Sequence, residues 1–110
     1  MELAAAVSVL SALGHQPRLE VFRLLVRMGP HGMAAGEIAR ETGTRQNTLS
    51  SNLSILNAAG LVASRREGRS IIYSAVHERV GELIGFLVED CCGGSAMVSA
   101  AAFGAVSPKG

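Results

Sequence analysis

The sequence predicts a mainly α-helical chain with one small β-hairpin. Residues 42–62, TGTRQNTLSSNLSILNAAGLV, place apolar residues at helical spacing and end at a glycine-containing turn. Two short β-prone runs follow, Val62–Arg66 and Ser70–Ala75, around the turn Glu67-Gly68-Arg69. Two helices followed by an arginine-bearing hairpin are the pattern of a winged helix-turn-helix. We therefore expect about five helices and a two-stranded wing.

Size and composition narrow the class of protein. A chain of 110 residues fits one domain with one small core. Apolar residues make up 48%, which argues against disorder of the whole chain, and the absence of Trp requires an aliphatic core. There is no run of about 18 apolar residues and no basic leader, so we expect no membrane span, no secretory signal and a cytoplasmic location.

The charge is unevenly distributed, although the net charge is only +1. Residues 1–44 carry four Arg and four Glu, which cancel. Residues 45–73 carry four Arg and one Glu, a net charge of +3, whereas residues 74–110 have a net charge of −2. The positive charge therefore lies in the segment of the fourth helix and the hairpin, as expected for contact with the phosphates of nucleic acid.

Apolar spacing and end signals predict five helices. Gly14 ends the first helix, and Pro17 suits the first turn of the second, where its missing N–H needs no partner. Gly29-Pro30-His31-Gly32 is expected to be a loop. The predicted helices are Glu2–Leu13, about Pro17–Met28, about Ala34–Glu41, about Arg45–Ala59 and about Val76–Asp90.

Three of these helices have apolar residues whose partners can be anticipated. In the second helix we expect Leu19, Phe22, Leu25 and Val26 to point inward, which makes it the central core helix. The first and last helices carry long stripes that either cover the core of the same chain or bury against a second copy. These stripes are Leu3, Val7, Leu10 and Leu13 in the first helix, and Val76, Val80, Leu83, Ile84, Leu87 and Val88 in the last.

The helix at about Arg45–Ala59 has the face expected of a recognition helix. Gly43 suits the end of the preceding helix, and Thr44 is expected to cap this one. Leu49, Leu53 and Leu56 form its apolar stripe. Its other side is polar but almost uncharged, so it can form hydrogen bonds with base edges in a major groove; the alternative is an ordinary surface helix. The residues expected at the bases are Gln46, Asn47, Thr48, Ser50 and Ser51.

The hairpin carries Arg65, Arg66 and Arg69, which are expected to contact phosphates or the minor groove. The alternatives are a surface hairpin with incidental arginines, or a winged domain that serves as a protein–protein adaptor.

Cys91 and Cys92 are the one group with chemistry beyond DNA contact. Thiolates are soft ligands that select soft metals and metalloids. The alternatives are a pair of small apolar residues or a redox sensor. Glu89, Asp90 and the negative end of the helix favour protonated thiols, which disfavours the redox alternative. From Gly93 onward the sequence is rich in Gly and Ala, and residues 93–110 are predicted to be a flexible tail.

Four motifs resemble those of the ArsR/SmtB family of metal- and metalloid-responsive repressors, over about residues 10–92. They are ALGHQPRLEVFRLL (Ala12–Leu25), GEIARETG (Gly36–Gly43), TLSSNLSILNAAGLV (Thr48–Val62) and RREGRSIIYS (Arg65–Ser74). The resemblance implies that residues 1–92 form a DNA-binding and dimerisation domain. It also implies a homodimeric repressor that leaves double-stranded operator DNA when an inducer binds.

The resemblance also bears on the inducer. His31–Ile38 contains no cysteine, and Ala75 and Val88 stand where the family's zinc site needs ligands. Arsenic-responsive members of the family carry vicinal cysteines at the end of the last helix, which matches Cys91 and Cys92. The third cysteine that some of these members have is missing from this sequence. We therefore expect trivalent arsenic (arsenite or methylarsenite) or antimonite at these two sulfurs, with one ion per chain.

No enzyme activity and no cofactor are expected. His15, His31 and His77 are isolated in the sequence, and no nucleophile is followed by a base and an orienting residue in a recognisable motif.

Overall fold

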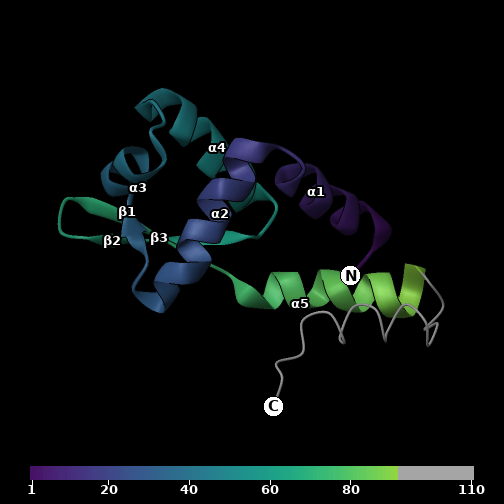
Figure 1. Ribbon diagram of the computed structural model, residues 1–110. Coiled ribbons are helices and arrows are strands. Elements are labelled where there is room, and N and C mark those ends of the chain that lie inside the picture. Colours follow the sequence, from purple (N-terminus) through teal and green to yellow (C-terminus); the bar gives the residue numbers. More distant parts are fainter. Residues whose placement is uncertain (92–110) are drawn as a thin grey trace, which may run out of the picture.

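The computed structural model describes residues 1–91, with the side chains of Asp90 and Cys91 left out (Figure 1). The predicted tail, residues 93–110, lies outside the described residues. All five predicted helices are present, and α5 continues into a π-helical segment, η2. The elements are α1 (Leu3–Leu13), α2 (Gln16–Met28), the 3-10 turn η1 (Gly29–His31), β1 (Met33–Ala34), α3 (Ala35–Thr42), α4 (Gln46–Ala58), β2 (Val62–Glu67), β3 (Ser70–Ala75), α5 (His77–Gly85) and η2 (Phe86–Cys91).

The sheet has three strands rather than the two that the sequence predicts. Its order is β1-β3-β2, and both pairings are antiparallel. β1 pairs Met33 with Tyr73 and Ala34 with Ile72. A strand of two residues has no alternation that a sequence can show, which is why it was missed. It covers one edge of the hairpin that would otherwise be open.

Gly32 allows β1 to approach β3. Its φ is +70°, and a Cβ at this position would lie 2.3 Å from the carbonyl oxygen of Tyr73. Only glycine fits here, because both the backbone angle and the close approach exclude a side chain.

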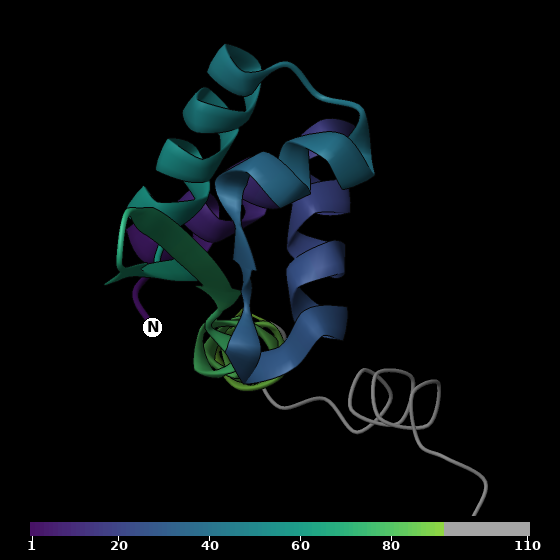
Figure 2. The ribbon, with the colours of Figure 1, turned by 90° about the vertical axis from the view of Figure 1, so that its left-hand side faces the viewer.

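The core is mainly aliphatic, as predicted, with Phe22 as its buried aromatic side chain, and it lies among α1 to α4, β1 and the start of β2, with Leu83 added from α5 (Figure 2). In α2, Phe22 and Leu25 are buried together with Val21, whereas Leu19 and Val26, which were expected to point inward, are exposed. Leu19 and Val26 lie at one edge of a broad apolar side, next to the charged side formed by Glu20, Arg23 and Arg27, so the apolar spacing alone placed them too far inward. The most deeply buried large side chains are Val9, Val21, Leu25, Ile38, Leu49, Leu56 and Leu61.

α1 packs on the core with its small side chains. Ala6, Val9 and Ala12 are buried, which lets the helix come close to its neighbours. Its bulky residues point away from the core of the chain. The exposed fractions are 69% for Leu3, 56% for Val7 and 46% for Leu10.

α5 leaves the rest of the domain beyond the sheet and runs below α1 in the view of Figure 1. Leu83 is buried in the core, and Val80 and Leu87 pack partly against it, whereas Ile84, from the same predicted stripe, is exposed. The stripe therefore covers the core of its own chain on one side and leaves apolar surface on the other. Among the described residues, no helix has the length and hydropathy needed to cross a membrane.

Candidate nucleic-acid interface

α3 and α4 form the helix-turn-helix, and Gly43 makes the turn between them. Its φ of +67° is left-handed, which confirms the position predicted for it. The predicted capping role of Thr44 is wrong, because the residue that caps α4 is Arg45, without a side-chain hydrogen bond. Thr44 Oγ1 instead lies 2.8 Å from Thr42 Oγ1, which donates to the carbonyl of Ile38. The two threonines therefore stabilise the end of α3. Thr44 does not cap α4 because it lies one residue before the N-cap position.

α4 presents the predicted polar face to solvent. Its apolar stripe is buried, as expected, by Leu49, Leu53 and Leu56. This burial turns the opposite side of the helix outward along its whole length. All five residues predicted to contact bases are exposed: Gln46, Asn47, Thr48, Ser50 and Ser51. Their contact with bases remains a prediction.

Asn52 is a member of α4 that the sequence analysis left out. It is the one buried polar residue among those described, and its Nδ2 has no hydrogen-bond partner there. It lies one turn after Leu49, on the inward side of the helix. Its neighbours in the sequence, Ser50 and Ser51, point outward, so the polar face does not extend to Asn52.

The three wing arginines have different surroundings. Arg65 donates from Nε to Glu67 at 2.8 Å, and from Nη2 and Nη1 to the carbonyls of His31 at 2.8 Å and Pro30 at 3.4 Å. Its side chain therefore ties β2 to the turn η1. Arg66 and Arg69 are exposed and form no hydrogen bond or ion pair within residues 1–89.

The same division applies to all nine arginines of the chain. Arg18, Arg65 and Arg79 each donate to backbone carbonyls at the end of a helix or in a turn. The other six donate to none of the residues that the structure describes. Arg45 is the one that the site prediction missed: it is exposed at the start of α4, where helix N–H groups and a cation together favour a phosphate. These six are Arg23, Arg27, Arg40, Arg45, Arg66 and Arg69.

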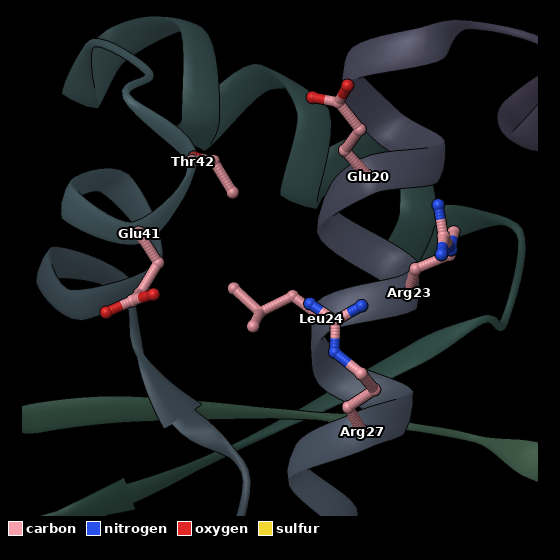
Figure 3. A pocket seen from close by; sticks show the side chains of 6 residues that line it. All are labelled: Glu20, Arg23, Leu24, Arg27, Glu41 and Thr42. Carbon is pink, nitrogen blue, oxygen red and sulfur yellow. The ribbon is translucent and has the colours of Figure 1, made fainter.

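A depression of about 240 Å³ lies between α2 and the end of α3 (Figure 3). Leu24 points from α2 towards α3, and charged residues of both signs surround it. None of the residues predicted to contact DNA lines it. The lining residues are Glu20, Arg23, Leu24, Arg27, Glu41 and Thr42.

The structure describes only part of the predicted inducer site. Cys91 ends η2, its side chain is not described, and Cys92 lies outside the described residues. The arrangement of the two sulfurs therefore stays a prediction. Among the side chains that are described, no three of His, Cys, Asp and Glu come together as a metal site.

The family whose sequence model matches residues 13–65 is described as a helix-turn-helix domain. The HTH-type transcriptional regulator YgaV of Escherichia coli (strain K12) is 33% identical over 87 residues, which cover 79% of this chain and 86% of that protein. The biofilm growth-associated repressor of Agrobacterium fabrum is 32% identical over 84 residues, 76% of this chain and 69% of the repressor.

A solved structure gives the same fold. It is the homodimeric winged helix-turn-helix DNA-binding domain of Mb0332 from Mycobacterium bovis, described as a possible ArsR-family transcriptional regulator. The TM-score is 0.66, the sequence identity is 32%, and the alignment covers 78% of each chain.

Proposed function

The chain belongs to the ArsR family of winged helix-turn-helix transcriptional regulators, and we propose that it is a homodimeric repressor of an inverted-repeat operator. The observation that carries the proposal is the exposed, uncharged polar face of α4, flanked by arginines that have no partner among the described residues. Gln46, Asn47, Thr48, Ser50 and Ser51 form hydrogen bonds with base edges. Arg45, Arg66 and Arg69 neutralise phosphates on either side.

The dimer is supported by the apolar surface that the chain leaves uncovered. Leu3, Val7 and Leu10 on α1 and Ile84 on α5 are exposed large aliphatic side chains. A second copy that covers them removes this surface from water. The homodimeric state of the similar Mb0332 domain supports the same assembly.

Repression needs no surface other than these. A dimer that occupies an operator blocks RNA polymerase by its presence alone, whereas activation requires a further contact with the polymerase. The similar Agrobacterium fabrum protein, which carries the name of repressor, supports this choice.

The inducer in this proposal is trivalent arsenic or antimony, bound by the sulfurs of Cys91 and Cys92. The support is chemical: two adjacent thiols at the end of the helical segment that follows the wing are soft ligands for a soft metalloid. Each chain binds one ion, and binding favours a dimer whose recognition helices no longer match both half-sites. A coupling free energy of about 1–3 kcal/mol weakens the operator complex about 5- to 150-fold.

The test is an anisotropy titration of a labelled duplex from the protein's own promoter, with a scrambled duplex as control. The wild type should prefer the promoter by about a thousandfold or more. Methylarsenite, arsenite or antimonite should release it, and the Cys91→Ser/Cys92→Ser variant should bind DNA normally without responding.

Each part of the proposal can fail separately. If the protein binds no duplex at low salt, it is not a repressor, and the alternative of a protein–protein adaptor takes its place. If trivalent arsenic still releases the Cys91→Ser/Cys92→Ser variant from DNA, the inducer binds at another site. Release of the wild type by hydrogen peroxide as readily as by the arsenical would make the thiols a redox sensor.

A further inference from the structure

The first turn of α5 is bonded to the end of α4. Arg79 donates from Nε to the carbonyl oxygen of Ala59 at 2.9 Å, and its Nη1 lies 2.8 Å from Glu82 Oε1. The backbone N–H of Val76 donates to the carbonyl of Leu61 at 2.8 Å. Two hydrogen bonds therefore connect the start of α5 to the three residues that follow α4.

The hydrogen bond from Arg79 supplies a donor to a carbonyl at the end of α4 that has no partner within the helix. The last carbonyls of a helix have no partner within the helix. Ala59 is 2% exposed, so its carbonyl depends largely on protein donors. Gly60 next to it has a φ of +78°, and a Cβ there would lie 3.0 Å from Arg79 Nε, which shows how closely the guanidinium lies against the turn.

The guanidinium is held in place from its own helix. The ion pair with Glu82 spans i to i+3 on α5, and the side chain of Arg79 is only 28% exposed. Packing of Leu83 and Leu61 into the core brings the elements together but is not directional. A hydrogen bond from a fixed planar group is directional, so it sets the angle between α5 and the end of α4.

We propose that Arg79 is a positioning residue that sets the separation and tilt of the two recognition helices in the dimer. The inference rests on the proposed function, in which α1 and α5 meet the second copy and α4 enters the major groove. α1 packs directly against α4, whereas the start of α5 reaches the end of α4 through the contact between Arg79 and Ala59. Arg79 thereby fixes the tilt of α4 relative to the α5 side of the dimer surface, and with it the half-site spacing that the dimer accepts.

The spacing of the half-sites gives a measurement that a purely structural role of Arg79 would not change. Adding one base pair moves a half-site by about 3.4 Å and turns it by about 35°. Operators with the natural spacing and with one or two base pairs added or removed should be titrated against the wild type, Arg79→Lys and Arg79→Gln. The wild type should lose affinity at least about tenfold for each altered spacing.

Arg79→Gln should bind the natural operator about tenfold more weakly and should discriminate among the spacings less than about threefold, because it loses a charge-assisted hydrogen bond. Arg79→Lys keeps the charge without the planar fork and should fall between the two. Arg18→Gln is the matched control: Arg18 donates to the carbonyls of Ala12 at 2.7 Å and Ser11 at 3.3 Å, at the end of α1. It should keep the wild-type spacing profile even where it lowers stability. A spacing profile of Arg79→Gln parallel to that of the wild type overturns the inference.

A second readout needs no DNA. Spin labels on Ser54→Cys, an exposed position of α4, report the distance between recognition helices in a dimer that also carries Cys91→Ser and Cys92→Ser. The distance distribution should be narrow with Arg79 and clearly broader with Arg79→Gln; equal widths contradict the proposal. A wild type that binds no operator refutes the proposed function, whereas this measurement still decides the role of Arg79.

Discussion

Arg65 and Arg66 are neighbours on β2, yet they face opposite sides of the strand because successive side chains alternate. Arg65 lies on the same side as Glu67 and bonds to it and to the turn η1. Arg66 has no partner among the described residues. The same type of residue therefore secures the wing at one position and is available to a phosphate at the next.

Salt dependence separates these two roles. Replacing Arg66 by Ala removes one phosphate contact from each copy, so the magnitude of the slope of log K against log salt should fall by about 2 for the dimer, on specific and random DNA alike. Arg65→Ala should weaken binding by loosening the wing and leave the slope within about 0.3 of the wild type. Titrations at four or five salt concentrations give both values. A slope that falls equally in both variants would mean that Arg65 contacts DNA directly.

Gly32 and Gly68 distinguish two reasons why a position requires glycine, which are a left-handed backbone angle and a lack of space for a Cβ. Both have positive φ, +70° and +63°, but only Gly32 faces a backbone oxygen, whereas nothing lies within 4 Å of a Cβ at Gly68. Gly32→Ala should lower the free energy of unfolding by at least about 3 kcal/mol, since β1 must separate from β3. Gly68→Ala should cost about 1 kcal/mol, the penalty of the left-handed backbone alone. Urea unfolding measures both, and similar losses would contradict the close-approach argument.

At the scale of elements, helices with a clear stripe were predicted well and the remaining details less so. The burial of Leu49, Leu53 and Leu56 follows from their spacing, and so does the outward polar face of α4. The inward side of α2 was only partly deduced, because its apolar side is broad and the spacing does not show that Leu19 and Val26 lie at its edge. β1 was missed because its pairing with β3 depends on contacts distant in the sequence.

The candidate site shows the same limits. Exposure of the residues predicted to contact bases follows from the helical period, but the hydrogen bonds of Arg65 to the turn η1 join residues more than 30 positions apart. No local pattern distinguishes Arg65 from Arg66 as a residue with partners. Arg45 already stood at the start of the predicted helix at about Arg45–Ala59, but a single cation beside an uncharged polar face forms no pattern that marks it as a phosphate contact.

α1 offers a test of the dimer surface on a single helix. Val7→Asp places a charge in the exposed stripe and should dissociate the dimer, because an unpaired carboxylate would be buried by the second copy. Ser8→Asp adds the same charge one residue along, about 100° around the helix, and should leave the dimer intact. Sedimentation equilibrium at micromolar concentrations distinguishes them. Dimers of equal stability in both variants would exclude α1 from the interface.

At the scale of the whole molecule, a small aliphatic core and a large uncovered apolar surface link folding to assembly. The chain has one core, and α1, α2, α4 and α5 each leave at least one large aliphatic side chain in solvent. A domain of this size has a small free energy of unfolding on its own, and burial of this surface between two copies increases it.

This link predicts that the melting temperature depends on protein concentration. Tenfold dilution should lower the Tm of the wild type by a few degrees, because the dimer is favoured by mass action. The Val7→Asp variant should melt at a lower temperature that does not change on dilution. Calorimetry at three concentrations provides the measurement, and a wild-type Tm independent of concentration would show that the folded chain does not depend on a partner.

Tyr73 gives the molecule an optical probe of its own. It is the only tyrosine and the chain has no tryptophan, so nothing masks its weak emission. The residue lies in the middle strand of the sheet, opposite Met33 on one side and Ser64 on the other. Its fluorescence therefore reports on the sheet and the part of the core beside it, and a change of lifetime when an oligonucleotide is added locates the event near β3 without any label.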